Sequence, residues 1–238
     1  MLSKNFTTSQ KKQQTLTSEN PVIIDWFSNP AQNHTDIIID QNNSGMYNEF
    51  FSGRTDMTII DCGANIGLWT LFAQDSCKKI IAVEPAPHCC YILQELTMGL
   101  DNIDIVRAAV SGSDGTIKMN IHSSPTSNSI IYKTDTDVSI DVETKTFATL
   151  IKEYDLKHVD MIKCDIEGGE MWAITPETIA AVADKVDSWF IEVHQTNRGE
   201  QAWPGNLEEN RQKLIKIFND AGYNARAVIN DQIFVRKV

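Results

Sequence analysis

A glycine-rich segment beside two acids is the first part of the sequence with residues suited to holding a ligand. It reads DCGANIG at 61–67, follows an apolar run typical of a buried strand and precedes a helix-like stretch. Gly63 lets the chain turn tightly and lets a ligand approach the backbone, and Gly67 allows close packing of the following helix. A dinucleotide fingerprint has a glycine where Asn65 stands, so this loop does not favour a pyrophosphate.

The two acids indicate what kind of ligand the loop accepts. Asp61, directly before the glycines, would repel a phosphate and suits a cationic or amine-bearing group. Glu84 ends the next strand-like run, KIIAVE, where a carboxylate can accept hydrogen bonds from both hydroxyls of a ribose. S-adenosylmethionine carries both an adenosyl ribose and a positive charge. The loop and the two acids together therefore predict a site for this cofactor.

A second group of acids follows a later apolar run, in the segment KCDIEGGE at 163–170. Asp165 closes the predicted strand, so its carboxylate is expected at the sheet edge where open α/β folds bind ligands. Three acids within six residues are unusual for a purely structural turn, and we predict functional roles for Asp165 and Glu167. Glu170 fits a solvated acid that caps the next helix, and its role stays open at this point.

The run SWFIEVH at 188–194 predicts another strand that ends in reactive side chains. Alternation places Glu192 and His194 on one face of it, and histidine is the natural general base near neutral pH. His194 and Asp165 are therefore our candidate bases. Asp165, Glu192 and His194 also offer the oxygen and imidazole ligands that suit Mg²⁺ or Mn²⁺, so a divalent metal is an alternative that we do not favour here.

The elements that position these residues alternate between short apolar runs and helix-like stretches from 57 to 194. This alternation is typical of a parallel sheet covered on both faces by helices. The end of the chain differs, because a helix over 206–223 is followed by NARAVI and QIFVRKV on either side of Asn230-Asp231, which predicts a β-hairpin. We expect a mostly parallel α/β fold that closes with an antiparallel pair.

Three segments between these landmarks are assigned by pattern. The run IDIVRAAV predicts a third strand over 103–110, and TIKMNIH at 116–122 predicts an added hairpin or edge strand. A helix over 175–186 is expected to begin at a threonine cap followed by proline.

The net charge argues against certain binding partners, and the cysteine content indicates a cellular compartment. The 238-residue chain has 21 Lys and Arg against 32 Asp and Glu, a formal net charge of −11, which argues against binding to nucleic-acid phosphates or an anionic membrane. The five cysteines include no CxxC pair, which predicts the reducing cytoplasm and no zinc site. No apolar run approaches the ~18 residues of a membrane span. We expect a polar N-terminal arm with short elements over 1–50 and one domain over 51–238.

Four pieces of the chain resemble, in order, the pattern of the FkbM family of S-adenosylmethionine-dependent methyltransferases: TIIDCGANIGLWTLFA, AVEPAP, TFATLIKEYDLKHVDMIKCDIEGGE and FIEVHQ. Many methyltransferases share the glycine motif, whereas K-x-D-x-E-G-x-E is more particular to this family. Gly169 stands where the family commonly has alanine. The resemblance implies a Rossmann-like class I methyltransferase fold with a seven-stranded sheet, and O-methylation of a hydroxyl on a sugar, glycan or other small natural product.

The resemblance also implies two sets of site residues. The catalytic residues facing the acceptor would be Asp165, Glu167 and His194. The residues of the cofactor site would be Asp61, Gly63, Ala64, Asn65, Gly67, Glu84, Pro85 and Ala108. The first 50 residues match nothing in the family pattern, so the identity of the acceptor stays open.

Three other functions compete with this interpretation. RNA ribose 2′-O-methyltransferases carry a Lys-Asp-Lys-Glu set around the target hydroxyl. Asp165 and Glu192 would supply two members of such a set, but no second lysine lies near the fifth strand. A non-catalytic binding module that keeps the fold would need no base such as His194. The sequence argues against an NAD-dependent oxidoreductase, because the glycine loop lacks the middle glycine and the chain ends in an antiparallel pair. Arg198 and Trp203 in the loop 196–206 are suggested acceptor contacts, and 123–137 is a suggested lid.

Overall fold

A computed structural model describes residues 47–51, 53–121, 138–194, 206–228 and 231–238 of the chain. Nearly all of the arm predicted over 1–50, the suggested lid and most of the loop 196–206 lie outside these residues. Within the described residues, no helix has the length and apolar character that crossing a membrane requires. All five cysteines belong to the described residues, where they are buried and form no disulfide bond.

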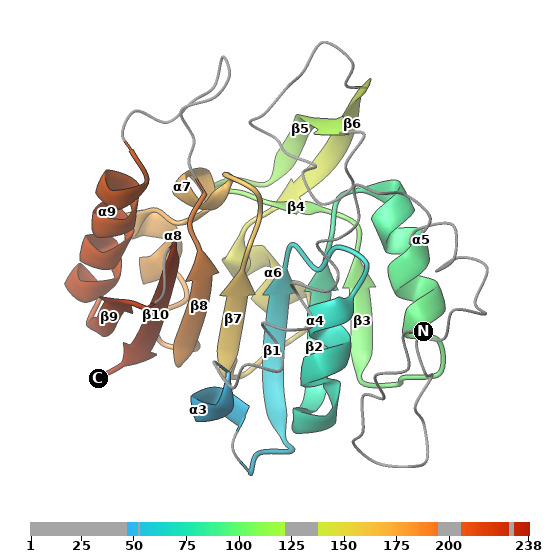
Figure 1. Ribbon diagram of the computed structural model, residues 1–238, viewed down its shortest axis with the longest axis horizontal. Helices are drawn as coiled ribbons and strands as arrows, with labels where there is room; N and C mark the ends of the chain where they lie inside the picture. Colours follow the sequence, from blue (N-terminus) through green and yellow to red (C-terminus); the bar gives the residue numbers. More distant parts are fainter. Residues whose placement is uncertain (1–46, 52, 122–137, 195–205, 229–230) are drawn as a thin grey trace, which may run out of the picture.

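The main sheet has seven strands in the order β3-β2-β1-β7-β8-β10-β9 (Figure 1). The first five of these pair in parallel, while β10 is antiparallel to both β8 and β9. The strands are β1 (Met57–Cys62), β2 (Cys77–Val83), β3 (Ile103–Val106), β7 (Met161–Cys164), β8 (Ser188–Glu192), β9 (Tyr223–Ala227) and β10 (Gln232–Lys237). This order confirms the predicted seven-stranded, mostly parallel sheet with a C-terminal antiparallel hairpin.

Helices cover both faces of this sheet, as predicted, because the strands are apolar at successive positions. Ile60 and Ile81 pack with residues of α6, α8 and α9, whereas their neighbours Ile59 and Ile80 pack with α3 and α4 on the other face. The helical elements are α3 (Asn48–Phe51), α4 (Leu68–Ala73), η2 (Gln74–Ser76), α5 (Pro87–Leu96), α6 (Phe147–Glu153), α7 (Glu170–Ala173), α8 (Pro176–Ala180) and α9 (Leu207–Asp220).

A second, smaller sheet corrects the predicted third strand. That strand was expected over 103–110, but β3 ends at Val106, and the chain turns at Ala108, whose N–H donates to the carbonyl of Val106. The remaining residues join the order β4-β6-β5, made of β4 (Ala109–Val110), β5 (Gly115–Ile121) and β6 (Val138–Lys145). The expected added hairpin at 116–122 is therefore one edge of a separate sheet.

The helix expected over 175–186 is shorter than predicted. Thr175 caps α8 through a capping box, and Pro176 opens it, but the helix ends at Ala180. The following residues form turns because the chain must straighten to pair Val186 with Val159 in an isolated parallel bridge. Apolar spacing continued past this point, but the bridge ends the helix.

Candidate active site

The parallel strands point to one edge of the sheet, at the top of Figure 1, and the glycine loop lies there. Gly63 has φ +79°, and a Cβ at this position would lie 1.7 Å from the carbonyl oxygen of Asp165. Gly67 has φ +90°, and its Cβ would lie 2.3 Å from a methyl carbon of Leu93 in α5. Both positions therefore require glycine, for the tight turn and the close helix packing that the sequence predicted.

Glu84 ties the loop to the start of α5. Its Oε2 accepts a hydrogen bond from the N–H of Asn65 at 2.9 Å, and its Oε1 accepts one from the N–H of Ala86 at 2.8 Å. Burial raises the pKa of Glu84 to about 7, although these two hydrogen bonds favour the ionised form. Each carboxylate oxygen has further acceptor capacity, so these bonds leave lone pairs for a ligand.

The remaining residues of the predicted cofactor set follow the ends of β1, β2 and β3. Ala64 is buried directly after Gly63, and its N–H donates to the carbonyl of Val83. Pro85 is half-buried between Glu84 and α5, and Ala108 is fully buried at the turn after β3.

Asp61 lies beneath the loop and is paired within the protein. It is fully buried, and its Oδ2 accepts a hydrogen bond from the hydroxyl of Thr70 at 2.6 Å. Lys163, directly opposite in the β1–β7 register, places its ammonium 3.6 Å from the other oxygen. The carboxylate of Asp61 therefore faces the ammonium of Lys163. A contact between Asp61 and the cofactor stays a prediction.

Lys163 is a site residue to which the sequence assigned no role. Its Nζ also donates to Oδ2 of Asp165 at 3.1 Å. Lys163 therefore connects Asp61, below the loop, with Asp165, at the end of β7. Burial alone would lower the pKa of Lys163, but Asp165 and Asp61 outweigh it and hold the pKa above its usual value. The register opposite Asp61 reveals this role, and a single sequence does not show registers.

The predicted acceptor residues Asp165, Glu167 and His194 come together with Glu192, and we call these four residues the carboxyl-edge cluster. Nε2 of His194 lies 3.8 Å from Oδ1 of Asp165 and 3.7 Å from Oε2 of Glu167. The same nitrogen lies 3.8 Å from Oε1 of Glu192. Glu167 has φ +53°, a left-handed conformation that is uncommon for a residue other than glycine.

Glu170, left open by the sequence, is not a solvated acid. It is fully buried, and its Oε1 accepts hydrogen bonds from the N–H groups of Ile166 and Gly168. The same oxygen lies 3.0 Å from Nδ1 of His194. Glu170 therefore fixes the orientation of the imidazole and leaves Nε2 turned toward the other carboxylates.

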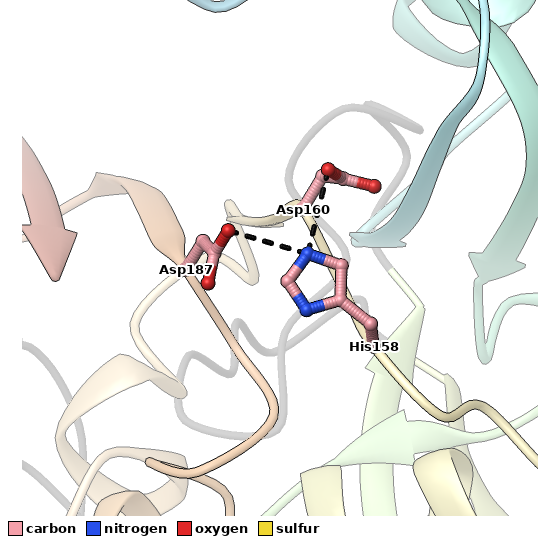
Figure 2. A group of neighbouring side chains, drawn as sticks. All are labelled: His158, Asp160 and Asp187. Atoms are coloured by element: carbon pink, nitrogen blue, oxygen red, sulfur yellow. Dashed lines mark ion pairs between the residues drawn. The ribbon is translucent and has the colours of Figure 1, made fainter.

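A second group of one histidine and two aspartates lies at the opposite, amino edge of the sheet (Figure 2). We call His158, Asp160 and Asp187 the amino-edge cluster. Nε2 of His158 lies 3.2 Å from Asp187 and 3.5 Å from Asp160. Asp160 also accepts from the guanidinium of Arg54 and, at 2.8 Å, from the N–H of Thr58. These bonds join the beginnings of β1 and β7.

The model of the methyltransferase FkbM domain matches residues 61–225, which include both clusters and the glycine loop. The chain belongs to the FkbM methyltransferase family. This confirms the family predicted from the four sequence pieces.

Two curated relatives of this FkbM chain are fungal methyltransferases. Methyltransferase sdnD of Sordaria araneosa is 27% identical over 148 residues, which cover 48% of this chain and 57% of the relative. Methyltransferase 1 of Beauveria bassiana is 30% identical over 141 residues, which cover 49% and 56%. The chain thus spans a little over half the length of the relatives it matches. Among solved structures, the fibrillarin pre-rRNA processing protein of Methanococcus jannaschii is similar over 76% of this chain and 66% of that one, at 13% identity and a TM-score of 0.47.

Burial and mutual repulsion set the protonation of the carboxyl-edge cluster in this FkbM domain. Burial raises the pKa of Glu167 to about 8, and the charge of Asp165 together with burial raises that of Glu192 to about 7. Burial would lower the pKa of His194, but Glu170 and Glu167 outweigh it and hold the pKa well above its usual value.

Asp165 is the carboxylate of the cluster that stays ionised most readily. Burial would raise its pKa, but the positive charges of Lys163 and His194 lower it below the usual value. At neutral pH the cluster therefore combines an ionised Asp165 with a protonated imidazole, and the two neighbouring glutamates titrate near neutrality.

Proposed function

We propose that this FkbM domain transfers the methyl group of S-adenosylmethionine to a hydroxyl oxygen of a sugar, a glycan or another small natural product. The observation that carries the proposal is the direct contact between the two halves of the site: Gly63 of the cofactor loop packs against the backbone of Asp165. A donor held by the loop and a hydroxyl near Asp165 would therefore be neighbours. Membership of the family supports the reaction class.

The proposed cofactor contacts follow from the glycine loop and from Glu84. The loop brings the backbone close to the nucleoside, because Gly63 and Gly67 carry no side chain there. Glu84, already fixed by two backbone N–H groups, accepts from the ribose hydroxyls with its remaining lone pairs. Asp61 and Lys163 hold the floor of the loop in place.

The chemistry is an in-line displacement. The acceptor oxygen forms a bond to the methyl carbon, the carbon–sulfur bond breaks, and its electron pair stays on sulfur. Alignment of two such reactants is worth ~7–11 kcal/mol, and assistance in removing the hydroxyl proton is worth ~10²–10⁴-fold. That proton leaves to Asp165, the ionised carboxylate, or to His194 once the imidazole has lost its own proton.

The proposal is tested by calorimetry with S-adenosylmethionine and its demethylated product, followed by transfer of a labelled methyl group to panels of glycans and small alcohols. We expect binding of both nucleosides. A protein that binds neither of them overturns the proposed function, because the glycine loop would then hold another ligand.

Glu84→Gln separates cofactor binding from the rest of the site. The amide keeps the shape of the carboxylate but loses its charge and half of its acceptor groups, and hydrogen bonds to a charged group are worth ~1.5–3 kcal/mol. We expect affinity for S-adenosylmethionine to fall about 10–100-fold. Unchanged affinity by calorimetry would remove Glu84 from the ribose site.

A further inference from the structure

We propose that Asp165, Glu167 and His194 bind one divalent cation, Mg²⁺ or Mn²⁺, beside the position of the acceptor hydroxyl. The inference deepens the proposed function, since the cation would act on the same acceptor. Its binding does not depend on that function and is measured without cofactor or acceptor.

The distances in the cluster are those of ligands around one ion. One ligand atom from each of the three residues lies within 4.8 Å of the other two. The separations of 3.7 and 3.8 Å from Nε2 of His194 to the two carboxylates exceed hydrogen-bond length. Ligands held about 2.1 Å from a cation lie about 3.0 Å apart at right angles and about 4.2 Å apart across it. The two separations from Nε2 fall between these limits.

The imidazole is also oriented as a metal ligand. A histidine bound to a metal through one ring nitrogen commonly donates the other N–H to a carboxylate, which fixes the tautomer. Glu170 takes that place at Nδ1 of His194, at 3.0 Å, and is itself held by two backbone N–H groups. The tautomer that donates to Glu170 leaves the lone pair on Nε2, the atom that faces Asp165 and Glu167.

Glu170 supplies an independent observation. Its side chain is fully buried, and its Oε2 has no hydrogen-bond partner among the described residues. A buried carboxylate with an unpartnered oxygen is costly unless positive charge lies nearby. A divalent cation at Nε2 would replace the proton of His194 and keep positive charge on this side of Glu170.

The count of charges points the same way. Four carboxyl groups lie around His194, and among the described residues the positive side chains that pair with them are Lys163 and His194. Lys163 is shared with Asp61, so it is not available to Asp165 alone. The four carboxyl groups are those of Asp165, Glu167, Glu170 and Glu192. A divalent ion that replaces the proton of His194 would add one positive charge to this group.

The types of ligand atom indicate which ion would bind and how it would act on the acceptor hydroxyl. Carboxylate oxygens with one imidazole suit Mg²⁺ and Mn²⁺. A hydroxyl that joins as a further ligand would lose its proton more easily, because the metal charge stabilises the alkoxide, and Glu192, which is not one of the three ligands, would accept that proton. The cation would also hold the acceptor oxygen at a fixed position beside the cofactor loop.

The test measures Mn²⁺ binding to the full chain after treatment with a chelator, by calorimetry and by electron paramagnetic resonance. We use pH 8, because protons compete with the metal for these ligands. We expect one equivalent to bind the wild type, and Asp165→Asn and His194→Ala to weaken binding at least tenfold. His158→Ala, the matched control at the amino edge, should bind as the wild type does.

The outcomes separate this inference from the proposed function. No binding at millimolar Mn²⁺, or binding that is lost in His158→Ala and kept in Asp165→Asn, overturns the cation site. Circular dichroism without metal shows whether each variant is folded, and Glu167→Gln replaces His194→Ala if that variant does not fold. Cofactor binding without metal binding refutes the cation alone, whereas metal binding without affinity for either nucleoside refutes the methyltransferase function alone.

Discussion

The two ends of β7 carry nearly the same side chains and use them differently. At the amino edge, His158 lies within 3.2 Å of Asp187, and Asp160 is occupied by Arg54 and a backbone N–H. Each acid there has a partner from the chain. The cluster therefore connects the beginnings of neighbouring strands through side chains and a backbone N–H of the chain itself.

At the carboxyl edge the same residue types remain apart. Nε2 of His194 is 3.7 Å or more from each of the three carboxylates that face it, and Glu170 has a buried oxygen with no described partner. Residue types alone do not distinguish a structural cluster from a functional one. What distinguishes them is whether the chain itself satisfies each polar atom.

The two edges also respond to pH with opposite signs. Burial would raise the pKa of Asp160, but the N–H of Thr58 and the charge of Arg54 outweigh it and lower the pKa. Glu167 and Glu192 have raised pKa values, because they are buried near other negative charges. Ionisation of Asp160 therefore favours folding at the amino edge, whereas ionisation of Glu167 and Glu192 opposes it at the carboxyl edge.

The largest expected difference between the edges is in turnover. Asp165→Ala and His194→Ala should each reduce the rate of methyl transfer by ~10²–10⁴-fold, because each removes a group that accepts the hydroxyl proton or holds the proposed cation. His158→Ala should keep the wild-type rate. Steady-state kinetics and calorimetry with S-adenosylmethionine test this, and cofactor affinity should stay near wild type in all three variants. Full activity in both carboxyl-edge variants would show that we have assigned the wrong residues.

The next effect is on stability and should appear at the amino edge. Asp160→Ala removes the acceptor of the Thr58 N–H and of the Arg54 guanidinium, and we expect the free energy of unfolding to fall by about 1–3 kcal/mol. The rate of methyl transfer per folded molecule should not change. Urea unfolding and kinetics below the transition test this. A loss of activity without a loss of stability would contradict the contrast between the two edges.

The smallest effect is a change in pH dependence, measured with a chelator present. Between the ordinary value near 4.5 and about 8, the folded protein keeps a proton on Glu167 that the unfolded chain has lost, so this residue makes stability fall as pH rises. Glu167→Gln should flatten that fall by at most ~1.4 kcal/mol per pH unit, and by less because solvent reaches part of the side chain.

Asp160→Asn is the matched control for this measurement and should show the opposite sign. The stabilisation by Asp160 is present above its ordinary pKa of 3.8 and is lost as pH falls through its lower folded value. The variant should therefore lose stability at neutral pH and less in acid. Parallel pH profiles for both variants would show that the two edges do not differ in protonation.

Most of the fold was predictable because apolar runs and turn residues report local structure directly. The grouping of Asp165, Glu167 and His194 was also predictable, because parallel strands end at one edge. The break after β3 was not, since Ala108 is as apolar as the residues of a continuous strand. Lys163 and Glu170 gained their roles from strand register and from packing around His194, and neither is visible in the order of residues.

The contact of Gly63 with the carbonyl of Asp165 has a consequence for engineering this protein. A slip of one residue between β1 and β7 would shift the donor past the acceptor by about 3.3 Å, roughly the full reach of a methyl transfer. Variants that accept other acceptors are therefore best sought by changing surface loops. The ends of β1 and β7, which align the two reactants, should be kept unchanged.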